Sequence, residues 1–124
     1  MSAELLLEKA SAFEHTARIG TDVARERLRQ VEKWGEQNHP DGTGGSNTEI
    51  LVQLARDAAD SAAKAGKLTW LDILREETEE AAAEVDPEKL RAELVQVAAV
   101  AVAWIEHIDR RRPHPSNPEG LPQA

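Results

Sequence analysis

The sequence predicts an all-α protein, a bundle of four to five helices that associates with copies of itself. Ala, Leu, Glu and Arg are abundant, β-branched clusters are few, and no stretch alternates between apolar and polar residues, a composition that favours helices. Only one Phe and three Trp occur in 124 residues, without any Tyr. A core of Ala, Leu and Val buries little area per residue, so a small domain of this kind is expected to gain stability by oligomerisation.

Capping and breaking residues place the helices of the first half. A first segment is expected over residues 3–18, where Gly20 interrupts it, and a second helix, capped by Thr21 or Asp22, runs to about residue 36. Gly, Pro and Asn residues make 38–47 a loop. Thr48 caps the next predicted helix, residues 49–65, which Gly66 ends.

Two further helices complete the predicted fold. Thr69 is expected to cap a helix over 70–85, and Pro87 suits the first position of a final helix that runs to about residue 110. Between residues 94 and 105 that helix has Gln96 as its only polar side chain, so we expect other helices of the bundle or oligomer to enclose it. The single domain is expected over 1–112, followed by a flexible Pro-rich tail at 113–124.

The composition excludes several classes of function. Lys and Arg number 15 against 23 Asp and Glu, which gives a formal charge of −8 and argues against nucleic-acid binding. The absence of Cys excludes disulfides and thiolate metal sites. The longest apolar run, residues 97–105, is too short to cross a bilayer, and the N-terminus does not resemble a signal peptide. A cytoplasmic protein without a membrane partner is therefore expected.

Acidic side chains on the last two predicted helices are expected to meet. If these helices form a hairpin about Asp86 and Pro87, Glu80 lies opposite Glu93 and Glu77 opposite Gln96. Residues three apart share a face of a helix, so three carboxylates and one amide converge. Glu77 also interrupts the apolar stripe of its own helix. Carboxylates crowded in a partly buried seam repel one another unless a cation lies among them, and oxygen ligands suit Mg²⁺.

Other polar residues nearby have simpler interpretations. Glu76 and Glu79 point away from the apolar stripe and are expected in solvent. Gln96 is open to two interpretations, as a member of the site or as an ordinary buried amide. A second Glu-x-x-Asp pattern, residues 106–109, begins 13 residues beyond Glu93. That is roughly 20 Å along a helix, too far to join the other carboxylates within one subunit.

Polar and aromatic residues also recur on the helix that precedes the Gly-rich loop. One interpretation is that its Trp packs on the bundle. The other is a nucleotide-binding face, in which the Trp stacks on a base and amides read the base edge. The candidate substrate-binding residues are Gln30, Lys33, Trp34, Gln37, Asn38 and His39. The loop lacks the Gly-Lys-Ser/Thr ending of a P-loop.

These motifs together resemble the MazG-like group of all-α nucleoside triphosphate pyrophosphohydrolases. The family pattern is Glu-x-x-Glu followed by Glu-x-x-Asp, and this chain has Glu-Glu-x-x-Glu at 76–80, twelve further residues, and Glu-Leu-x-Gln at 93–96. The Lys-Trp-Gly-Glu-Gln-Asn-His-Pro run at 33–40 also matches. The resemblance covers about residues 21–110, the expected core of the domain.

The resemblance implies a homodimer or homotetramer that hydrolyses a nucleoside triphosphate to the monophosphate and pyrophosphate with Mg²⁺, or with Mn²⁺ in its place. Glu77, Glu80 and Glu93 would be catalytic metal ligands, one of them orienting or deprotonating the attacking water. Gln96 stands where the family has Asp. An amide oxygen can coordinate Mg²⁺, but it carries no charge and cannot act as a base.

Two other functions remain open from the sequence. The first is a nucleotide-binding or sensing protein in which the change to Gln96 has weakened or removed catalysis. The second is a structural helical oligomer whose carboxylates are surface or interface charges. The sequence does not select the base or sugar of a nucleotide, nor the number of metal ions.

Overall fold

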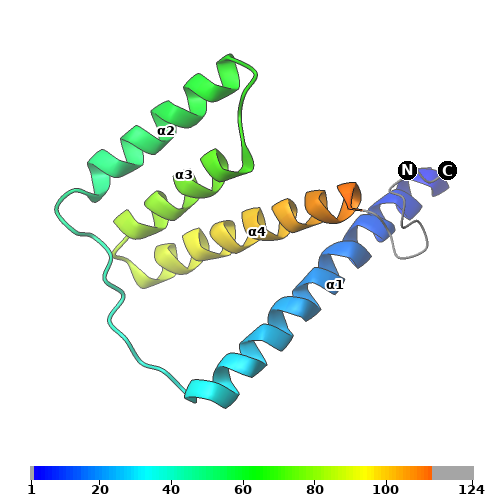
Figure 1. Cartoon of the computed structure of the whole chain (residues 1–124), viewed down its shortest axis with the longest axis horizontal. Coiled ribbons are helices and arrows are strands. Elements are labelled where there is room, and N and C mark those ends of the chain that lie inside the picture. Colours follow the sequence, from blue (N-terminus) through cyan, green and yellow to red (C-terminus); the bar gives the residue numbers. More distant parts are fainter. Residues whose placement is uncertain (1, 113–124) are drawn as a thin grey trace. The chain divides into compact units, whose positions relative to one another are not determined.

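The computed structural model describes residues 2–112 and is all-helical over that range, with four α-helices and no strand (Figure 1). The helices are α1 (Ala3–Trp34), α2 (Thr48–Lys64), α3 (Trp70–Ala83) and α4 (Pro87–Arg111). The predicted tail at 113–124 lies outside the described residues. The predicted all-α class is therefore confirmed.

The chain forms two compact units. Within the described range, one unit joins residues 2–35 to residues 102–112, and the other comprises residues 36–101. In the first unit, His15 on α1 contacts Asp109 on α4 at 3.1 Å, and the Thr16 hydroxyl donates a hydrogen bond to Glu106. The second Glu-x-x-Asp pattern is thus engaged with α1.

The prediction that Gly20 divides the N-terminal region into two helices is wrong. Helix α1 is continuous through Gly20, and the hydroxyl of Thr21 donates to the carbonyl of Ala17 instead of capping a new helix. A Gly inside a helix costs only about 1 kcal/mol relative to Ala, which a helix of 32 residues can absorb. The helix ends at Gly35, whose φ of 66° is readily adopted only by glycine.

Helix α2 begins one residue earlier than predicted. Asn47, not Thr48, is its N-cap, and the Thr48 hydroxyl donates to the carbonyl of Gly45 at 2.9 Å. Gly66, with a φ of 69°, follows its C-terminus as predicted. Helix α3 confirms the predicted Thr69 cap, because Thr69 and Asp72 form a reciprocal capping box.

Few side chains are buried in this single chain. Val52 and Ala59 on α2, Ala81 on α3 and Leu90 on α4 are the buried apolar residues of the unit 36–101. The expectation that α4 is enclosed is wrong for one chain alone, since Leu94 and Val95 are 51% and 54% exposed. The apolar composition of α4 therefore exceeds what the described residues of one chain cover.

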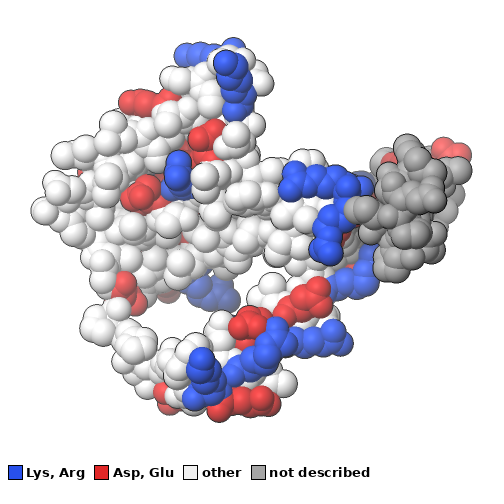
Figure 2. All heavy atoms as spheres, viewed as in Figure 1, with Lys and Arg blue, Asp and Glu red and all other residues white. Residues whose placement is uncertain are grey.

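The charged side chains do not form a continuous basic surface on the face that Figure 2 shows, where Lys and Arg lie in separate groups among Asp and Glu. Within residues 2–112, no helix combines the length and the apolar character that crossing a bilayer requires.

Candidate metal centre

The turn between α3 and α4 brings their acidic residues together. Helix α3 ends at Ala83, two residues earlier than predicted, because the Glu84 carboxylate accepts hydrogen bonds from the backbone N–H groups of Val85 and Asp86. The Asp86 carboxylate then accepts from the N–H of Lys89, in the first turn of α4. With Pro87 at the first helical position, these contacts reverse the chain within three residues.

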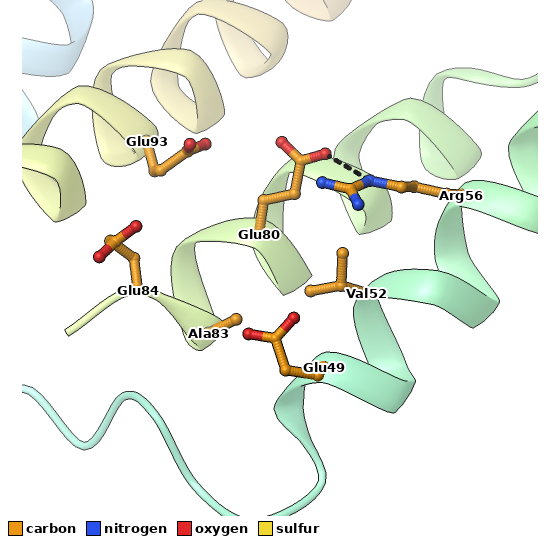
Figure 3. A pocket seen from close by; sticks show the side chains of 7 residues that line it. All are labelled: Glu49, Val52, Arg56, Glu80, Ala83, Glu84 and Glu93. Atoms are coloured by element: carbon orange, nitrogen blue, oxygen red, sulfur yellow. Dashed lines mark hydrogen bonds and ion pairs between the residues drawn. The ribbon is translucent and has the colours of Figure 1, made fainter.

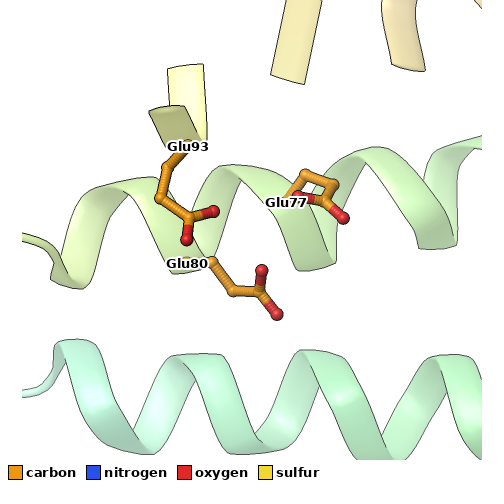
Figure 4. Close-up of side chains that lie close together, drawn as sticks. All are labelled: Glu77, Glu80 and Glu93. Atoms are coloured by element: carbon orange, nitrogen blue, oxygen red, sulfur yellow. The ribbon is translucent and has the colours of Figure 1, made fainter. Parts of the chain in front are cut away.

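Glu77 and Glu80 on α3 and Glu93 on α4 converge as the hairpin geometry predicts. Each offers one carboxylate oxygen, and the three oxygens lie within 4.8 Å of one another. Figure 4 shows the three side chains directed into the same space. All three are half-buried, so their charges are only partly screened by water.

The cluster changes the acidity of Glu77. Burial raises the pKa of its carboxyl group above the usual 4.5, and the neighbouring charges of Glu80, Glu93 and Glu76 raise that pKa further. A raised pKa means that the environment disfavours the ionised form. The metal-free seam is therefore electrostatically unfavourable for Glu77, and a cation bound among these carboxylates would relieve that repulsion.

A pocket of about 160 Å³ lies beside this cluster, in the unit 36–101. Two apolar residues line it, together with five charged ones, which are Glu49, Arg56, Glu80, Glu84 and Glu93. Figure 3 shows Arg56 extending from α2 towards Glu80, with its Nε 3.2 Å from the Glu80 carboxylate. Four carboxylates against one guanidinium leave the pocket strongly negative.

Two of these charged pocket residues, Glu49 and Arg56, were missed from the sequence, and Glu84 was expected only as an extension of the stripe on its helix. Arg56 and Glu49 lie on α2, and Glu84 lies just after α3. The acidic motif on α3 and α4 contains no information about which α2 residues face it. The i, i+7 spacing of Glu49 and Arg56 does place them on one face of α2, but that face is identified only once α2 is seen to pack on α3.

The expectation that Glu76 and Glu79 are solvated side chains is also wrong, because both are half-buried. Glu76 is half-buried, and its pKa is raised by burial and by the charges of Glu80 and Asp60, with Arg56 acting in the opposite direction. Glu76 therefore belongs to the same electrostatic environment as the cluster. The prediction overlooked α2, whose Asp60 and Arg56 lie close enough to act on Glu76.

Gln96 lies one turn beyond Glu93 on α4, and its side chain is exposed. The interpretation of Gln96 as an ordinary buried amide is therefore wrong for the single chain. Its position one turn after Glu93 is compatible with the predicted place opposite Glu77. Because the residue is exposed, water can solvate its amide group.

The candidate nucleotide-binding residues fall into two groups. Gln30, Lys33 and Trp34 lie in the last turns of α1, in the unit that contains residues 2–35. Trp34 is 56% exposed, so the alternative that it packs into a bundle is not met within one chain. The Lys33 Nζ lies 4.6 Å from the centroid of the Trp34 ring, and the Arg27 guanidinium donates to the Gln30 side-chain oxygen at 2.6 Å.

Gln37, Asn38 and His39 lie in the non-helical segment 35–47, where all three are exposed. They belong to the unit 36–101, as does the acidic cluster. The end of that segment is fixed to the unit, because the Gly44 N–H donates to the carbonyl of Ala82 on α3 at 2.8 Å. Gly44 has a φ of 78°, and a Cβ there would collide with Val85.

The three carboxylates fit a divalent cation that prefers oxygen. Two oxygens on one Mg²⁺ are at most about 4.2 Å apart, and on one Ca²⁺ about 5.2 Å. Three oxygens on one octahedral Mg²⁺ include at least two pairs only about 3.0 Å apart, so from separations within 4.8 Å the carboxylates would have to approach one another by up to about 2 Å, which rotation of the Glu side chains allows. The spacing alone accepts either ion, so the preference for Mg²⁺ comes from the family resemblance.

Comparison with known proteins yields no relative for this chain. No protein-family model matches it, and no curated protein or solved structure matches it significantly. The resemblance to the MazG-like group therefore stays a prediction carried by the motifs at 33–40, 76–80 and 93–96.

Proposed function

We propose that this protein is a Mg²⁺-dependent nucleoside triphosphate pyrophosphohydrolase, which cleaves an NTP or dNTP to the monophosphate and pyrophosphate. The observation that carries the proposal is the convergence of Glu77, Glu80 and Glu93 from two helices. The motif spacing that predicted this convergence is the same spacing that resembles the family.

Electrostatics supports a metal-dependent reaction over a metal-free one. A nucleoside triphosphate carries several negative charges, and it would be repelled by a pocket that is lined by four carboxylates and one guanidinium. Bound Mg²⁺ supplies charge that offsets both this repulsion and the negative charge developing during phosphoryl transfer. The three carboxylates would hold Mg²⁺, and they would also position the water that attacks the α-phosphorus.

The volume of the pocket limits how much of a nucleotide it can enclose. About 160 Å³ is smaller than the roughly 300–1,000 Å³ of sites that enclose a ligand of nucleotide size. The pocket therefore suits the metal and part of the polyphosphate, while the nucleoside must be held by other residues. Gln37, Asn38 and His39 belong to the same unit as the pocket, and we propose them for that role. Gln30, Lys33 and Trp34 belong to the other unit and are candidates through the sequence pattern alone, with Trp34 expected to stack on the base.

The test is a panel of the standard NTPs and dNTPs with purified protein and Mg²⁺ or Mn²⁺, followed by separation of the products on ion exchange. We expect the monophosphate and pyrophosphate together, and neither in EDTA. Diphosphate with orthophosphate would show that a different bond is cleaved. No product from any nucleotide would contradict the activity on standard substrates.

The exposed Gln96 favours a second candidate, a nucleotide-binding protein that has lost catalysis. This alternative predicts that the protein binds nucleotide in Mg²⁺ without turning it over, and that Gln96→Asp restores hydrolysis by returning a charged ligand to the family position. Single-turnover assays of the wild type and of Gln96→Asp distinguish the two. Equal activity of both proteins would contradict the alternative.

A further inference from the structure

Among residues 2–112, Arg56 is the only Lys or Arg that lines the acidic pocket. Its guanidinium reaches across from α2 to one oxygen of Glu80, with Nε and Oε1 3.2 Å apart (Figure 3). The side chain of Glu80 is 21% exposed and that of Arg56 48% exposed. Arg56 thus lines the pocket and is held there by a partly exposed ion pair, not by a buried network.

The ion pair involves a carboxylate that also belongs to the metal cluster. Glu80 lies within the group whose oxygens approach to 4.8 Å, so a guanidinium and a divalent cation would compete for the same negative charge. A positive charge beside a metal ligand disfavours the binding of a second cation by Coulomb repulsion.

We propose, on the basis of the proposed function, that Arg56 is an exchangeable counter-cation of the site. It neutralises Glu80 in the metal-free protein, releases Glu80 when a divalent cation binds, and then binds phosphate oxygens of the nucleotide. The exchange leaves Glu80 next to a cation in both states.

The side chain itself is suited to both partners. A guanidinium presents a planar set of N–H donors that matches carboxylate and phosphate oxygens alike. An exposed ion pair of this kind contributes little stability, so exchanging it costs little. Among the described residues no other Lys or Arg lines the pocket. Once released from Glu80, the guanidinium of Arg56 would therefore be the cationic side chain that can bind a polyphosphate in this pocket.

The first measurement is calorimetric titration of Mn²⁺, without nucleotide, into the wild type and Arg56→Met. We expect the variant to bind Mn²⁺ roughly three- to tenfold more tightly, because the competing charge is gone. Arg75→Met is the matched control, because it removes the same charge from α3 outside this pocket, and it should change the affinity less than twofold. Arg56→Gln serves as a second neutral variant in case Arg56→Met folds poorly.

The direction in which Mn²⁺ affinity changes in Arg56→Met tests the proposal. If Arg56 merely positioned Glu80 as a ligand, its removal would weaken Mn²⁺ binding, and that result would overturn the proposal, as would an unchanged affinity. A wild type that binds no Mn²⁺ would contradict the proposed function as well. If the wild type binds Mn²⁺ and the Arg56 variants bind it no more tightly, the proposed exchange is wrong but the proposed function is not contradicted.

The second measurement tests the phosphate half of the exchange. At saturating Mn²⁺, a non-hydrolysable nucleoside triphosphate analogue should bind Arg56→Met at least about fivefold more weakly than the wild type, and Arg56→Lys should recover part of the loss. Opposite effects of one substitution on metal and on nucleotide are not produced by simple damage to the fold. Unchanged nucleotide affinity would overturn this half of the proposal.

Discussion

The acidic seam between α3 and α4 differs from the end of α1 in how its charges are balanced. At the end of α1, polar groups satisfy one another: Arg29 pairs with Glu26, Arg27 with Gln30, and Lys33 lies over the ring of Trp34. In the seam, Glu77, Glu80 and Glu93 converge, while Arg56 is the single cation lining the adjacent pocket.

The two regions therefore support a binding site in different ways. Groups that neutralise one another on a helix surface require no ligand to explain them, whereas like charges held together oppose folding unless something binds them. The raised pKa of Glu77, caused first by burial and then by its acidic neighbours, is the physical expression of that cost. The proposal of a cation in the seam therefore rests on the charges of the seam itself, whereas the proposal of a nucleotide at the end of α1 rests mainly on the resemblance.

The largest expected effect comes from removing a carboxylate from the seam. If the proposed function holds, Glu80→Gln should reduce the rate of nucleotide hydrolysis at least about 100-fold, because it removes one of the proposed ligands of the metal ion, whose charge is worth several kcal/mol in the transition state. Steady-state assays over a range of Mg²⁺ concentrations measure the change. Saturation with Mg²⁺ should recover part of the activity if affinity for the metal is what fell.

Glu79→Gln is the matched control for Glu80→Gln. Glu79 is the preceding residue of α3, but it lines a separate groove with Arg75 and Leu51. Its substitution removes the same charge and should change the rate less than twofold. Equal losses in the two variants would show that the seam has no special role and that only the net charge of α3 matters.

A smaller effect is expected at the end of α1. Trp34→Ala should raise KM for the nucleotide about tenfold with little change in kcat, since base stacking contributes about 1–3 kcal/mol. Trp34→Phe retains an aromatic plane and should recover most of the affinity. Because Trp34 is 56% exposed, the fold should tolerate both changes. Unchanged KM in Trp34→Ala would remove this residue from the proposed nucleotide site.

The fold was predictable where local signals act alone. The Thr69–Asp72 capping box, the Pro87 helix start and the glycine after α2 are short-range features that the structure confirms. Gly20 misled the prediction, because a breaker residue lowers helix stability without forbidding a helix, and the long flanking segments decide the outcome. The expected enclosure of α4 is not met within one chain, where Leu94 and Val95 stay exposed, because an apolar composition does not specify which surface covers a helix.

The candidate site was predictable to the extent that it lies on one hairpin. Symmetry about residues 86 and 87 is sufficient to pair Glu80 with Glu93 and to bring Glu77 beside them. The pocket residues on α2 were missed because their position depends on how α2 packs against α3. Arg56 and Glu80, for example, form an ion pair although they are 24 residues apart in the sequence. Sequence spacing within one helix indicates which residues share a face, but not what that face contacts.

The smallest effect, and the one that tests the seam without any nucleotide, is the pH dependence of stability. The folded protein holds the proton of Glu77 more tightly than the unfolded chain does, because its pKa is raised above 4.5. As the pH rises from 4.5 through that raised pKa, the folded state is progressively disfavoured. In EDTA, Glu77→Gln should therefore melt about 2–4 °C above the wild type near pH 7.5, and the difference should shrink towards pH 4.5.

Comparing the two proteins at each pH isolates Glu77. Asp72, whose pKa is lowered mainly by backbone and side-chain hydrogen bonds from Thr69, loses its stabilising contribution as the pH falls, but it does so equally in both proteins. Excess Mg²⁺ should reverse the order at pH 7.5, since the wild type then gains a bound cation that Glu77→Gln holds less well. If the variant stayed the more stable of the two in Mg²⁺, the crowding of these carboxylates would have a cause other than a metal ion.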